Sequence, residues 1–349
     1  MTTASIAPQI SELVEGHSLG AAGAAGVLGV ILSGTCPPEQ VAGFLVAMAA
    51  KGPTTEELVG LLDAMTALGV RLELPSDLAD RAVDVVGTGG DGAGTVNVST
   101  MSALVVAGAG VPVVKHGSRK ASSLVGAADL LEALGVTIAP GPDVVARCVL
   151  EAGFGFCFAP AFHPALAAVA PVRAALGVRT VFNFLGPMAN PAGVTRLLLG
   201  VSDPVLVDLM ATVVAERGVR RALVVRGEDG LDEVSISGPT RVVEVATDPA
   251  GDVELRESWI DPRSHGLQLS SLDSIRGGDA AHNAAVARSV LDGEPGPARD
   301  VVLVNAAAAL VAAGSCERID EGIVAAEESI DSGSARGVLD TVISLSASH

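Results

Sequence analysis

The sequence predicts an α/β fold: a small N-terminal all-helical domain, followed by a larger domain with a mixed, mostly parallel sheet flanked by helices. Two observations lead to this prediction. Apolar residues recur at helical spacing from Ile10 to about Leu74. After Pro75-Ser76-Asp77, short β-rich runs alternate with Ala- and Leu-rich helical stretches, an order typical of parallel strands joined by helical crossovers.

This change of pattern sets the expected domain boundaries. We place the small helical domain over residues 1–75 and the α/β domain over residues 80–349. A further helical part near residues 165–190 is a candidate to join the first domain.

Local residue types mark the helix ends in the N-terminal region. Breaks are expected at Gly52-Pro53 and at Gly69, since glycine and proline interrupt helical hydrogen bonding. Thr54 or Thr55, followed by Glu57, is expected to begin the next helix. A hydroxyl there can cap free amides, and an acid favours the positive end of the helix.

Short runs of aliphatic residues are expected to form the parallel strands. They are Val83 to Val86, Val111 to Val114, Leu197 to Val201 and Ala222 to Val225. Helices are expected at Asp129 to Leu134, Pro204 to Arg217, Ala280 to Leu291 and Asp300 to Ala313. Val234 to Ile236 and Val242 to Val245, joined across Gly238-Pro239, have the pattern of a hairpin, so the sheet is expected to be mixed.

The composition argues against several classes of protein. The 349 residues are 49% hydrophobic, enough for a large core, and carry 22 Lys and Arg against 40 Asp and Glu, a net charge of −18. Nucleic-acid binding needs clustered basic side chains that neutralise phosphates, so no nucleic-acid partner is expected. Only 2% of residues are aromatic, too few for a platform on which single-stranded bases stack.

The cysteines and apolar runs indicate a cytoplasmic protein without a membrane span. The four cysteines have no metal-binding spacing and no secretory signal opens the chain, so reduced thiols are expected. The stretch Ala152 to Val172 is apolar enough to suggest a span, but Pro160, Pro164 and Pro171 interrupt it. We interpret it as an irregular buried segment.

The segment Asp84 to Thr100, DVVGTGGDGAGTVNVST, indicates a phosphate-binding loop. A β-run ends in five glycines within eight positions, which lets the backbone approach a bulky anion closely. Asn97, Ser99 and Thr100 follow at a helix start and can donate hydrogen bonds to the same anion. An ordinary tight loop is the alternative, and the pattern matches neither the P-loop nor the dinucleotide fingerprint.

A second anion-binding segment is expected at Lys115 to Gly126, KHGSRKASSLVG, directly after another β-run. Lys115, Arg119 and Lys120 are concentrated here in a chain poor in basic residues, which indicates an anionic ligand. A solvated basic loop is the alternative. His116 can hydrogen-bond the loop as readily as it can meet a substrate, and both roles stay open.

Two further segments carry charged candidates. The turn Gly227 to Val234, GEDGLDEV, places Asp232 and Glu233 side by side after a β-run. Adjacent carboxylates suit Mg²⁺ in a site that also holds phosphates, although many acidic turns are simply solvated. Within Phe162 to Asn190, Arg173 lies between apolar helical stretches. A buried guanidinium needs a carboxylate partner, which an internal Asp or Glu or a ligand could supply.

Together, GTGGDG, NVST, KHGSR with paired serines, VR with FNFLGPMANP, and DGLDE, in this order, resemble the anthranilate phosphoribosyltransferase family of tryptophan biosynthesis. The likeness includes the helical N-terminus around AMAAKGPTTEEL. It implies a homodimer with the active site in a hinge cleft between a helical and an α/β domain. It also implies transfer of the 5-phosphoribosyl group from 5-phosphoribosyl 1-diphosphate (PRPP) to the amine of anthranilate, with Mg²⁺ as cofactor.

The resemblance assigns site residues position by position. It implies PRPP binding by Gly87, Gly90, Asp91, Thr95, Asn97, Val98, Ser99, Thr100, Lys115, His116, Gly117, Ser118, Arg119, Lys120, Ala121, Ser122, Ser123 and Ala127. It implies Mg²⁺ binding by Ser99, Asp232 and Glu233. It implies anthranilate binding by Gly87, Ser118 and Arg173, with Arg173 receiving the carboxylate. No residue is singled out as a general base.

The chain departs from the family pattern mainly on the acceptor side. Ser118 stands where the family has an asparagine that contacts anthranilate, and Leu124 and Val125 replace a lysine and a serine. Arg226 stands where a histidine is usual. Three hypotheses follow: a family member that tolerates Ser118, a paralogue that acts on a related aromatic carboxylic acid, or a non-catalytic relative that binds nucleic acid. The small number of substitutions favours the first.

Overall fold

The computed structural model describes residues 4–119 and 124–347. The chain divides into two compact units, each built from two separate stretches of sequence. Unit 1 comprises the residues up to Arg71 together with Ala159–Pro191. Unit 2 comprises Leu72–Phe158 together with the residues from Ala192 onward. The site candidates Lys120, Ala121, Ser122 and Ser123 lie outside the described residues.

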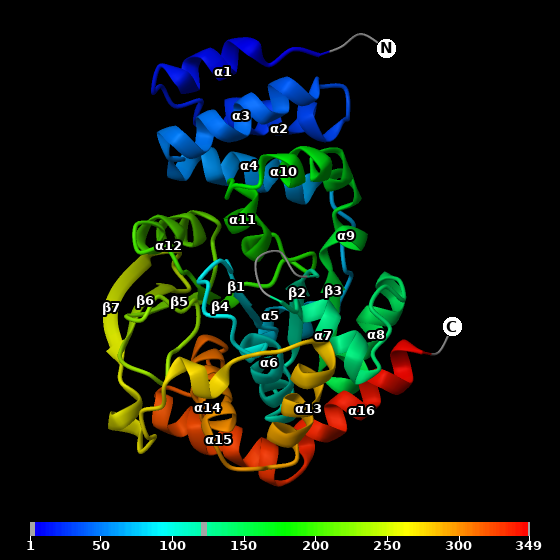
Figure 1. Cartoon of the computed structure of the whole chain (residues 1–349), viewed down its shortest axis with the longest axis vertical. Helices are drawn as coiled ribbons and strands as arrows, with labels where there is room; N and C mark the ends of the chain where they lie inside the picture. Colours follow the sequence, from blue (N-terminus) through cyan, green and yellow to red (C-terminus); the bar gives the residue numbers. More distant parts are fainter. Residues whose placement is uncertain (1–3, 120–123, 348–349) are drawn as a thin grey trace. The chain divides into compact units, whose positions relative to one another are not determined.

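The described part of unit 1 is built from helices (Figure 1). They are α1 (Ala7–Val14), α2 (Gly20–Leu32), α3 (Pro38–Lys51), α4 (Thr55–Ala67), α9 (Ala159–Phe162), α10 (Ala170–Leu176) and α11 (Phe182–Leu185), with 3₁₀ turns η1 (Pro164–Ala168) and η2 (Gly186–Met188). The predicted start of α4 is confirmed. Thr54 Oγ1 accepts a hydrogen bond from the Glu57 N–H (3.3 Å), and the Glu57 carboxylate accepts one from the Thr54 N–H (2.8 Å).

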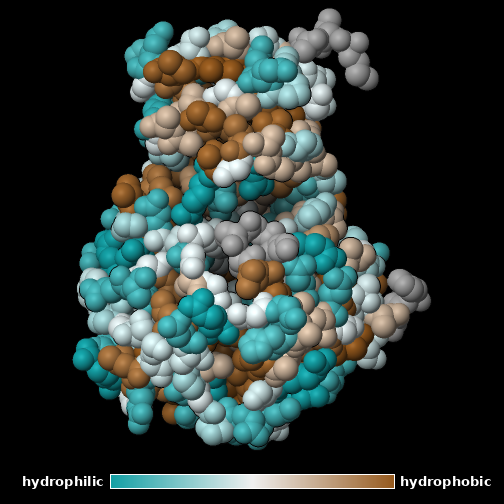
Figure 2. Space-filling view, viewed as in Figure 1, coloured by the Kyte–Doolittle hydropathy of each residue, from teal (hydrophilic) through white to brown (hydrophobic). Residues whose placement is uncertain are grey.

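Helices α2 and α4 approach each other closely because α4 carries a glycine at the crossing. An alanine at Gly60 would place its Cβ 2.0 Å from the carbonyl oxygen of Ala21. Apolar side chains also lie on the surface of unit 1 (Figure 2). Val14 is 73% exposed and Val46 is 46% exposed, so this unit presents apolar surface that the described residues leave uncovered.

Unit 2 contains the strands and the remaining helices. The strands are β1 (Asp84–Gly87), β2 (Val113–Gly117), β3 (Phe154–Phe158), β4 (Arg196–Gly200), β5 (Arg221–Gly227), β6 (Thr240–Thr247) and β7 (Val253–Ile260). The helices are α5 (Ser76–Arg81), α6 (Val98–Gly108), α7 (Ala127–Leu134), α8 (Pro142–Ala152), α12 (Leu206–Glu216), α13 (Ala280–Leu291), α14 (Pro297–Ala312), α15 (Ile319–Asp331) and α16 (Ser334–Ser346), with 3₁₀ turns η3 (Pro262–His265) and η4 (Leu272–Ile275).

The sheet is mixed, as the sequence predicts. Five strands lie in the order β1-β4-β5-β6-β7, and β2 and β3 form a separate parallel pair. β1, β4 and β5 are parallel to one another, whereas β6 and β7 join antiparallel. A parallel bridge between Val83 and Val113 connects the two groups of strands. The parallel register puts Gly87, the last residue of β1, opposite Gly200, the last residue of β4.

A buried helical layer supports this sheet, with α14 and α6 packed together (Figure 1). Residues 301–312 of α14 are all buried. Glycines permit the close approach of the helices around it. An alanine at Gly322 of α15 would place its Cβ 2.8 Å from the Ala307 backbone, and one at Gly108 of α6 would place it 2.5 Å from the Ala335 N.

Two sequence predictions about strands are wrong. Residues 234–236 form no strand, and the expected hairpin partner 242–245 lies in β6, which pairs instead with β5 and β7. The segment expected to be irregular and buried, 152–172, begins with strand β3, which pairs with β2 in parallel register. The four predicted parallel runs do fall in β1, β2, β4 and β5.

Cys36, Cys148, Cys157 and Cys316 are free thiols, and the first three are buried. Among the helices of the described ranges, none combines the length and the apolar character that crossing a bilayer requires.

Candidate functional site

The acidic turn, residues 227–234 with Asp232 and Glu233, lies against the ends of strands β1 and β4. An alanine at Gly87 would place its Cβ 2.4 Å from Asp232 Oδ2, and one at Gly200 would place it 1.6 Å from the Asp232 carbonyl oxygen. Real Cβ atoms essentially never come within 3.0 Å of such atoms. The absence of side chains at Gly87 and Gly200 therefore makes room for Asp232 at the carboxyl end of the parallel strands, where α/β folds usually bind ligands.

Asp232 and Glu233 join the glycine-rich loop to the start of helix α6. Asp232 Oδ2 accepts a hydrogen bond from the Gly89 N–H at 2.6 Å, and Glu233 Oε1 accepts one from the Ser99 N–H at 3.1 Å. Ser99 lies in the first turn of α6, where backbone N–H groups have no partner within the helix. The two acids thus contact residues that precede them by 143 and 134 positions.

Lys115 is a buried cation beside these acids. Its side chain on β2 is 2% exposed, and its Nζ donates to the Val85 carbonyl (2.5 Å) and to Ser99 Oγ (3.2 Å). Burial lowers the pKa of Lys115, while the carboxylates of Asp84 and Glu233 oppose that shift. Lys115 therefore holds the Ser99 hydroxyl and places positive charge next to the acidic turn.

The two acids of the turn are poorly compensated. Burial first, and then the nearby Asp91 carboxylate, raise the pKa of Asp232 to about 7, although the Gly89 N–H favours its ionised form. Burial and the neighbouring Asp232 raise the pKa of Glu233 well above its usual range. A divalent cation at this position would favour the ionised form of both groups.

These residues fit Mg²⁺ only when a ligand completes its coordination. Within residues 4–119 and 124–347, no group of three or more His, Cys, Asp and Glu side chains is arranged to hold a metal ion. Asp232 and Glu233 supply two carboxylates next to the glycine-rich loop. That number suits Mg²⁺, which is commonly bound through one or two carboxylates together with substrate phosphates and water.

The glycine-rich loop has a backbone that residues with a Cβ rarely adopt. Gly89, Gly90, Gly92 and Gly94 have φ values of 67°, 80°, 71° and 62°. Asp91 closes a turn within the loop by accepting a hydrogen bond from the Ala93 N–H at 3.1 Å. The loop therefore turns sharply several times between β1 and α6, and glycine makes those turns possible.

Ser202, which the sequence did not single out, supports this loop from the end of β4. Its Oγ donates to the Gly89 carbonyl at 2.9 Å, and its N–H donates to Thr88 Oγ1 at 3.3 Å. The carbonyl of Ser202 accepts a hydrogen bond from Arg226 Nε at 3.0 Å. Arg226, one of the departures from the family pattern, is thus part of the scaffold beneath the loop. No local signal in the sequence marks Ser202.

The NVST segment is largely turned inward. Asn97 Nδ2 donates to the Val125 carbonyl, and Asn97 Oδ1 accepts from Asn283 Nδ2, both at 2.9 Å. Both ends of this amide are therefore engaged inside the protein, so its side chain ties neighbouring loops together. Val98 and Thr100 are each 1% exposed. Thr95, which precedes the segment, forms an antiparallel bridge with Arg276.

Much of the charge in the basic loop is neutralised internally. Arg119 Nη1 lies 2.8 Å from both Asp129 Oδ1 and Glu132 Oε2, and the guanidinium of Arg119 lies over the Phe158 ring. His116 is 3% exposed, and its N–H donates to Asp84 Oδ1 at 3.2 Å. Within the described part of this loop, Lys115 is therefore the cation that lies next to the acidic turn.

The other predicted positions of this segment lie where β2 ends and α7 begins. Ser118 is exposed, and its carbonyl accepts a hydrogen bond from the Ala128 N–H at 3.2 Å. Gly117 ends β2, where an alanine Cβ would lie 2.9 Å from the Phe156 ring. Ala127 is the first residue of α7. Ser118 is thus an exposed residue of this basic segment.

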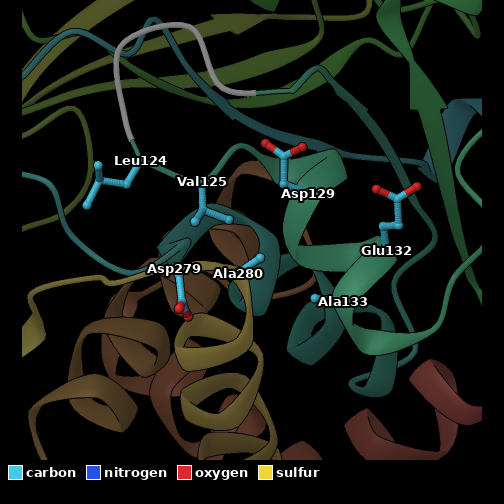
Figure 3. A pocket seen from close by; sticks show the side chains of 7 residues that line it. All are labelled: Leu124, Val125, Asp129, Glu132, Ala133, Asp279 and Ala280. Carbon is cyan, nitrogen blue, oxygen red and sulfur yellow. The ribbon is translucent and has the colours of Figure 1, made fainter.

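A pocket of about 430 Å³ lies beside this loop (Figure 3). Its lining residues are Leu124, Val125, Asp129, Glu132, Ala133, Asp279 and Ala280. Asp129 and Glu132 project from α7 and pair with Arg119, while Asp279 Oδ1 caps α13 by accepting from the His282 N–H at 2.8 Å. None of these lining residues is basic, so the lining itself offers a phosphate no cation.

Arg173 lies on α10 in unit 1. Its guanidinium lies over the Phe182 ring at 5.3 Å from the centroid, and burial lowers its pKa. Among the residues that the structure describes, no Asp or Glu forms an ion pair with it. The internal carboxylate partner that the sequence left open is therefore not found there, so the guanidinium can receive a ligand's carboxylate.

Asn305 is the second contact residue that sequence reasoning missed. Its side-chain amide contacts Val234, the residue that follows Glu233. A signal was present, because Asn305 is the single polar residue in the run VVLVNAAAALVA at 301–312.

Comparison with known proteins identifies the family. The model described as "Glycosyl transferase family, a/b domain" matches residues 79–336, and the model described as "Glycosyl transferase family, helical bundle domain" matches residues 8–69. The anthranilate phosphoribosyltransferase of Thermomicrobium roseum is 50% identical over 97% of this chain and 96% of its own. That of Salinispora arenicola is 50% identical over 95% of this chain and 94% of its own.

Solved structures of anthranilate phosphoribosyltransferases match this chain over nearly its full length. Anthranilate phosphoribosyltransferase from Thermus thermophilus matches with a TM-score of 0.89 and 41% identity, covering 97% of this chain and 99% of its own. The Saccharomyces cerevisiae enzyme, in complex with PRPP and Mg, matches with a TM-score of 0.88 and 30% identity, covering 99% of both chains. On sequence and structure alike, this chain belongs to the anthranilate phosphoribosyltransferase family.

Proposed function

We propose that this chain transfers the 5-phosphoribosyl group of PRPP to the amine of anthranilate, the second step of tryptophan synthesis from chorismate. The bond between ribose C1 and the diphosphate oxygen breaks, and a bond between C1 and the amine nitrogen forms. The nitrogen then loses one proton. The products are N-(5-phosphoribosyl)anthranilate, diphosphate and that proton.

The observation that carries this proposal is the contact between the acidic pair and the glycine-rich loop. Asp232 accepts from the Gly89 N–H and Glu233 accepts from the Ser99 N–H, while Lys115 holds the Ser99 hydroxyl. Amides, one cation and two carboxylates thus meet at the start of a helix. This combination suits a diphosphate that arrives with a divalent cation.

The chain's own residues bind and orient the donor. The glycine-rich loop would bind the phosphates through its backbone, because glycines let the chain approach a bulky anion closely. Lys115 adds a buried positive charge at the same place. When bound at Asp232 and Glu233, Mg²⁺ supplies positive charge that stabilises the diphosphate as it leaves. The parallel register that sets Gly87 opposite Gly200 leaves room for Asp232 beside these groups.

The acceptor is assigned to Arg173. Its guanidinium has no carboxylate partner among the described residues, so a carboxylate-bearing acceptor satisfies it through charge-assisted hydrogen bonds. The amine of anthranilate is an aryl amine that is neutral at pH 7, so its lone pair is available without a strong base. Orientation of amine and C1 therefore contributes much of the rate, and no general base is assigned.

A related aromatic acid is the second candidate acceptor. Ser118 is exposed and offers a hydroxyl where the family pattern has an amide; a hydroxyl is shorter and cannot donate and accept through two separate atoms. Arg173 restricts either acceptor to one that bears a carboxylate. A nucleic-acid partner remains disfavoured by the net charge of −18.

We further propose a cytoplasmic homodimer that uses Mg²⁺. The four free thiols are typical of a reducing compartment. Exposed apolar residues of unit 1, such as Val14 and Val46, provide surface that a second copy can cover.

The test follows the loss of anthranilate fluorescence with purified protein, PRPP and Mg²⁺, against a reaction without Mg²⁺. Mg²⁺-dependent loss of fluorescence is the expected result. The double variant Asp232→Asn with Glu233→Gln should show no turnover, and full activity in that variant would refute the metal assignment. No fluorescence loss, with PRPP binding still detected by calorimetry, would favour a related aromatic acid as acceptor.

A further inference from the structure

Asn305 places a fully hydrogen-bonded amide in the most apolar helix of unit 2. The side chain is completely buried in the middle of α14. Its Oδ1 accepts a hydrogen bond from the Val234 N–H, and its Nδ2 donates to the carbonyls of Val234 and Val301, all at 2.8 Å. The amide therefore contacts both backbone groups of one residue in the acidic turn.

The Asn305 side chain gives the Val234 backbone the two hydrogen bonds that a neighbouring strand would otherwise supply. Val234 is completely buried and belongs to no strand, so water cannot satisfy its N–H and C=O. A buried backbone group without a partner is strongly disfavoured. Asn305 supplies both partners through a side chain, in the same donor and acceptor arrangement that an adjacent strand provides.

The position of Val234 gives this contact its consequence. Val234 directly follows Glu233, whose carboxylate accepts a hydrogen bond from the Ser99 N–H. Asp232, one residue before Glu233, accepts a hydrogen bond from the Gly89 N–H. Fixing both backbone groups of Val234 therefore fixes the direction in which the chain presents the two carboxylates. The hydrogen bonds come from α14, whose residues 301–312 are all buried.

The helix itself has no need of this amide. Asparagine is a weak helix former because its side chain competes for backbone hydrogen bonds. The neighbours Val304 and Ala306 are completely buried apolar residues, so leucine would suit α14 better. The contact to Val234 is what accounts for a polar residue at this point.

We propose that Asn305 is a positioning residue for the cation and diphosphate site, acting through Val234 to hold Asp232 and Glu233 in place. This inference rests on the proposed function, because it assigns the two carboxylates to the Mg²⁺ that accompanies PRPP.

The test compares Asn305→Leu with the wild-type enzyme. Leucine keeps a similar volume and favours the helix, but it leaves Val234 without its partners. The Mg²⁺ concentration for half-maximal activity should rise about 10- to 100-fold, the effect typical of removing a group that orients metal ligands. The KM for anthranilate should change by less than about two-fold. Calorimetry of PRPP binding in the presence of Mg²⁺ should show a parallel loss of affinity.

Ser329→Ala is the matched control. Ser329 is 3% exposed, and its Oγ donates a hydrogen bond to the Val105 carbonyl at 2.7 Å. Ser329→Ala therefore removes a buried hydrogen bond between α15 and α6 and changes no residue of the acidic turn. Its Mg²⁺ dependence should stay at the wild-type value even when the melting temperature falls. Asn305→Ser, which retains one polar atom, should give a smaller rise and serves if the leucine variant does not fold.

Wild-type Mg²⁺ dependence and PRPP affinity in a folded Asn305 variant would overturn the inference, as would an equal shift in Ser329→Ala. A wild-type enzyme that binds PRPP with Mg²⁺ but leaves anthranilate unchanged would refute the acceptor assignment alone. The calorimetric comparison would then still decide the role of Asn305. A wild-type chain that binds no PRPP would refute both.

Discussion

Gly200 provides a sharp test of how the acidic turn is held. In Gly200→Ala the new Cβ would lie 1.6 Å from the Asp232 carbonyl oxygen, so that oxygen must move by about 1.4 Å to reach the 3.0 Å below which such contacts essentially do not occur. The obstacle is backbone, so no side-chain rotation relieves it. A misplacement of about 1 Å at an active site can reduce the rate about 100-fold.

We therefore expect Gly200→Ala to lose at least about 100-fold in kcat/KM for PRPP. Overpacking of this kind also destabilises a fold by about 1–3 kcal/mol, so thermal unfolding must be measured beside the fluorescence assay. Gly238→Ala is the control, because an alanine Cβ at Gly238, which follows the acidic turn and precedes β6, meets no atom within 4 Å. It should keep wild-type activity.

The clash argument would be refuted by Gly200→Ala activity within about three-fold of wild type. It would also be refuted if Gly238→Ala lost as much activity as Gly200→Ala. A folded Gly200→Ala protein with weak PRPP binding and unchanged anthranilate KM would support the argument, since the displaced groups belong to the donor side.

Three further predictions use other parts of the molecule. Burial raises the pKa of Asp232 to about 7 in the folded protein, against 3.8 for the free side chain, so the folded state binds this proton more tightly than the unfolded state does. The free energy of unfolding of the metal-free protein should therefore fall by up to about 4 kcal/mol as the pH rises from about 4 to 7. Asp232→Asn should reduce that fall without abolishing it, because burial also raises the pKa of Glu233. Urea unfolding across this range checks the change, and an unchanged slope would contradict the assignment. Arg173→Met should raise the KM for anthranilate about 10- to 100-fold by removing a charge-assisted hydrogen bond, and it should leave the KM for PRPP unchanged. If steady-state kinetics show the reverse, Arg173 belongs to the PRPP site and not to the anthranilate site. Gly60→Ala should lower the melting temperature, because its Cβ would lie 2.0 Å from the Ala21 carbonyl oxygen. In the control Gly26→Ala the new Cβ meets no atom within 4 Å, so this change should stabilise α2 by up to about 1 kcal/mol. Equal melting temperatures of the two variants would argue against close packing of α2 on α4.

The expected hairpin failed for a physical reason. Val234 to Ile236 alternates like a strand and precedes Gly238-Pro239, a turn signal. In the fold, the backbone of Val234 pairs with the Asn305 side chain, and the partners of β6 are β5 and β7. β7 was not predicted because Glu254, Arg256 and Glu257 interrupt its apolar residues and leave no aliphatic run. Charged residues are common on an exposed edge strand.

By itself, the sequence determined the local features. The capping box of Thr54 and Glu57, the parallel runs and the glycine-rich loop depend on the residue types of short segments, so local physics was enough to predict them. It also determined the family, because ordered segments retain their residues along the chain.

Only the tertiary structure decided how the site is assembled. Asp232 meets Gly89 across 143 positions, and Val234 meets Asn305 across 71. Such contacts depend on strand register and helix packing, which leave no periodic trace in the sequence near either partner. The same holds for the inward turn of Asn97 and for the ion pairs of Arg119. A side chain's type indicates what it can bind, but which partner it binds follows from the packing of distant elements against one another.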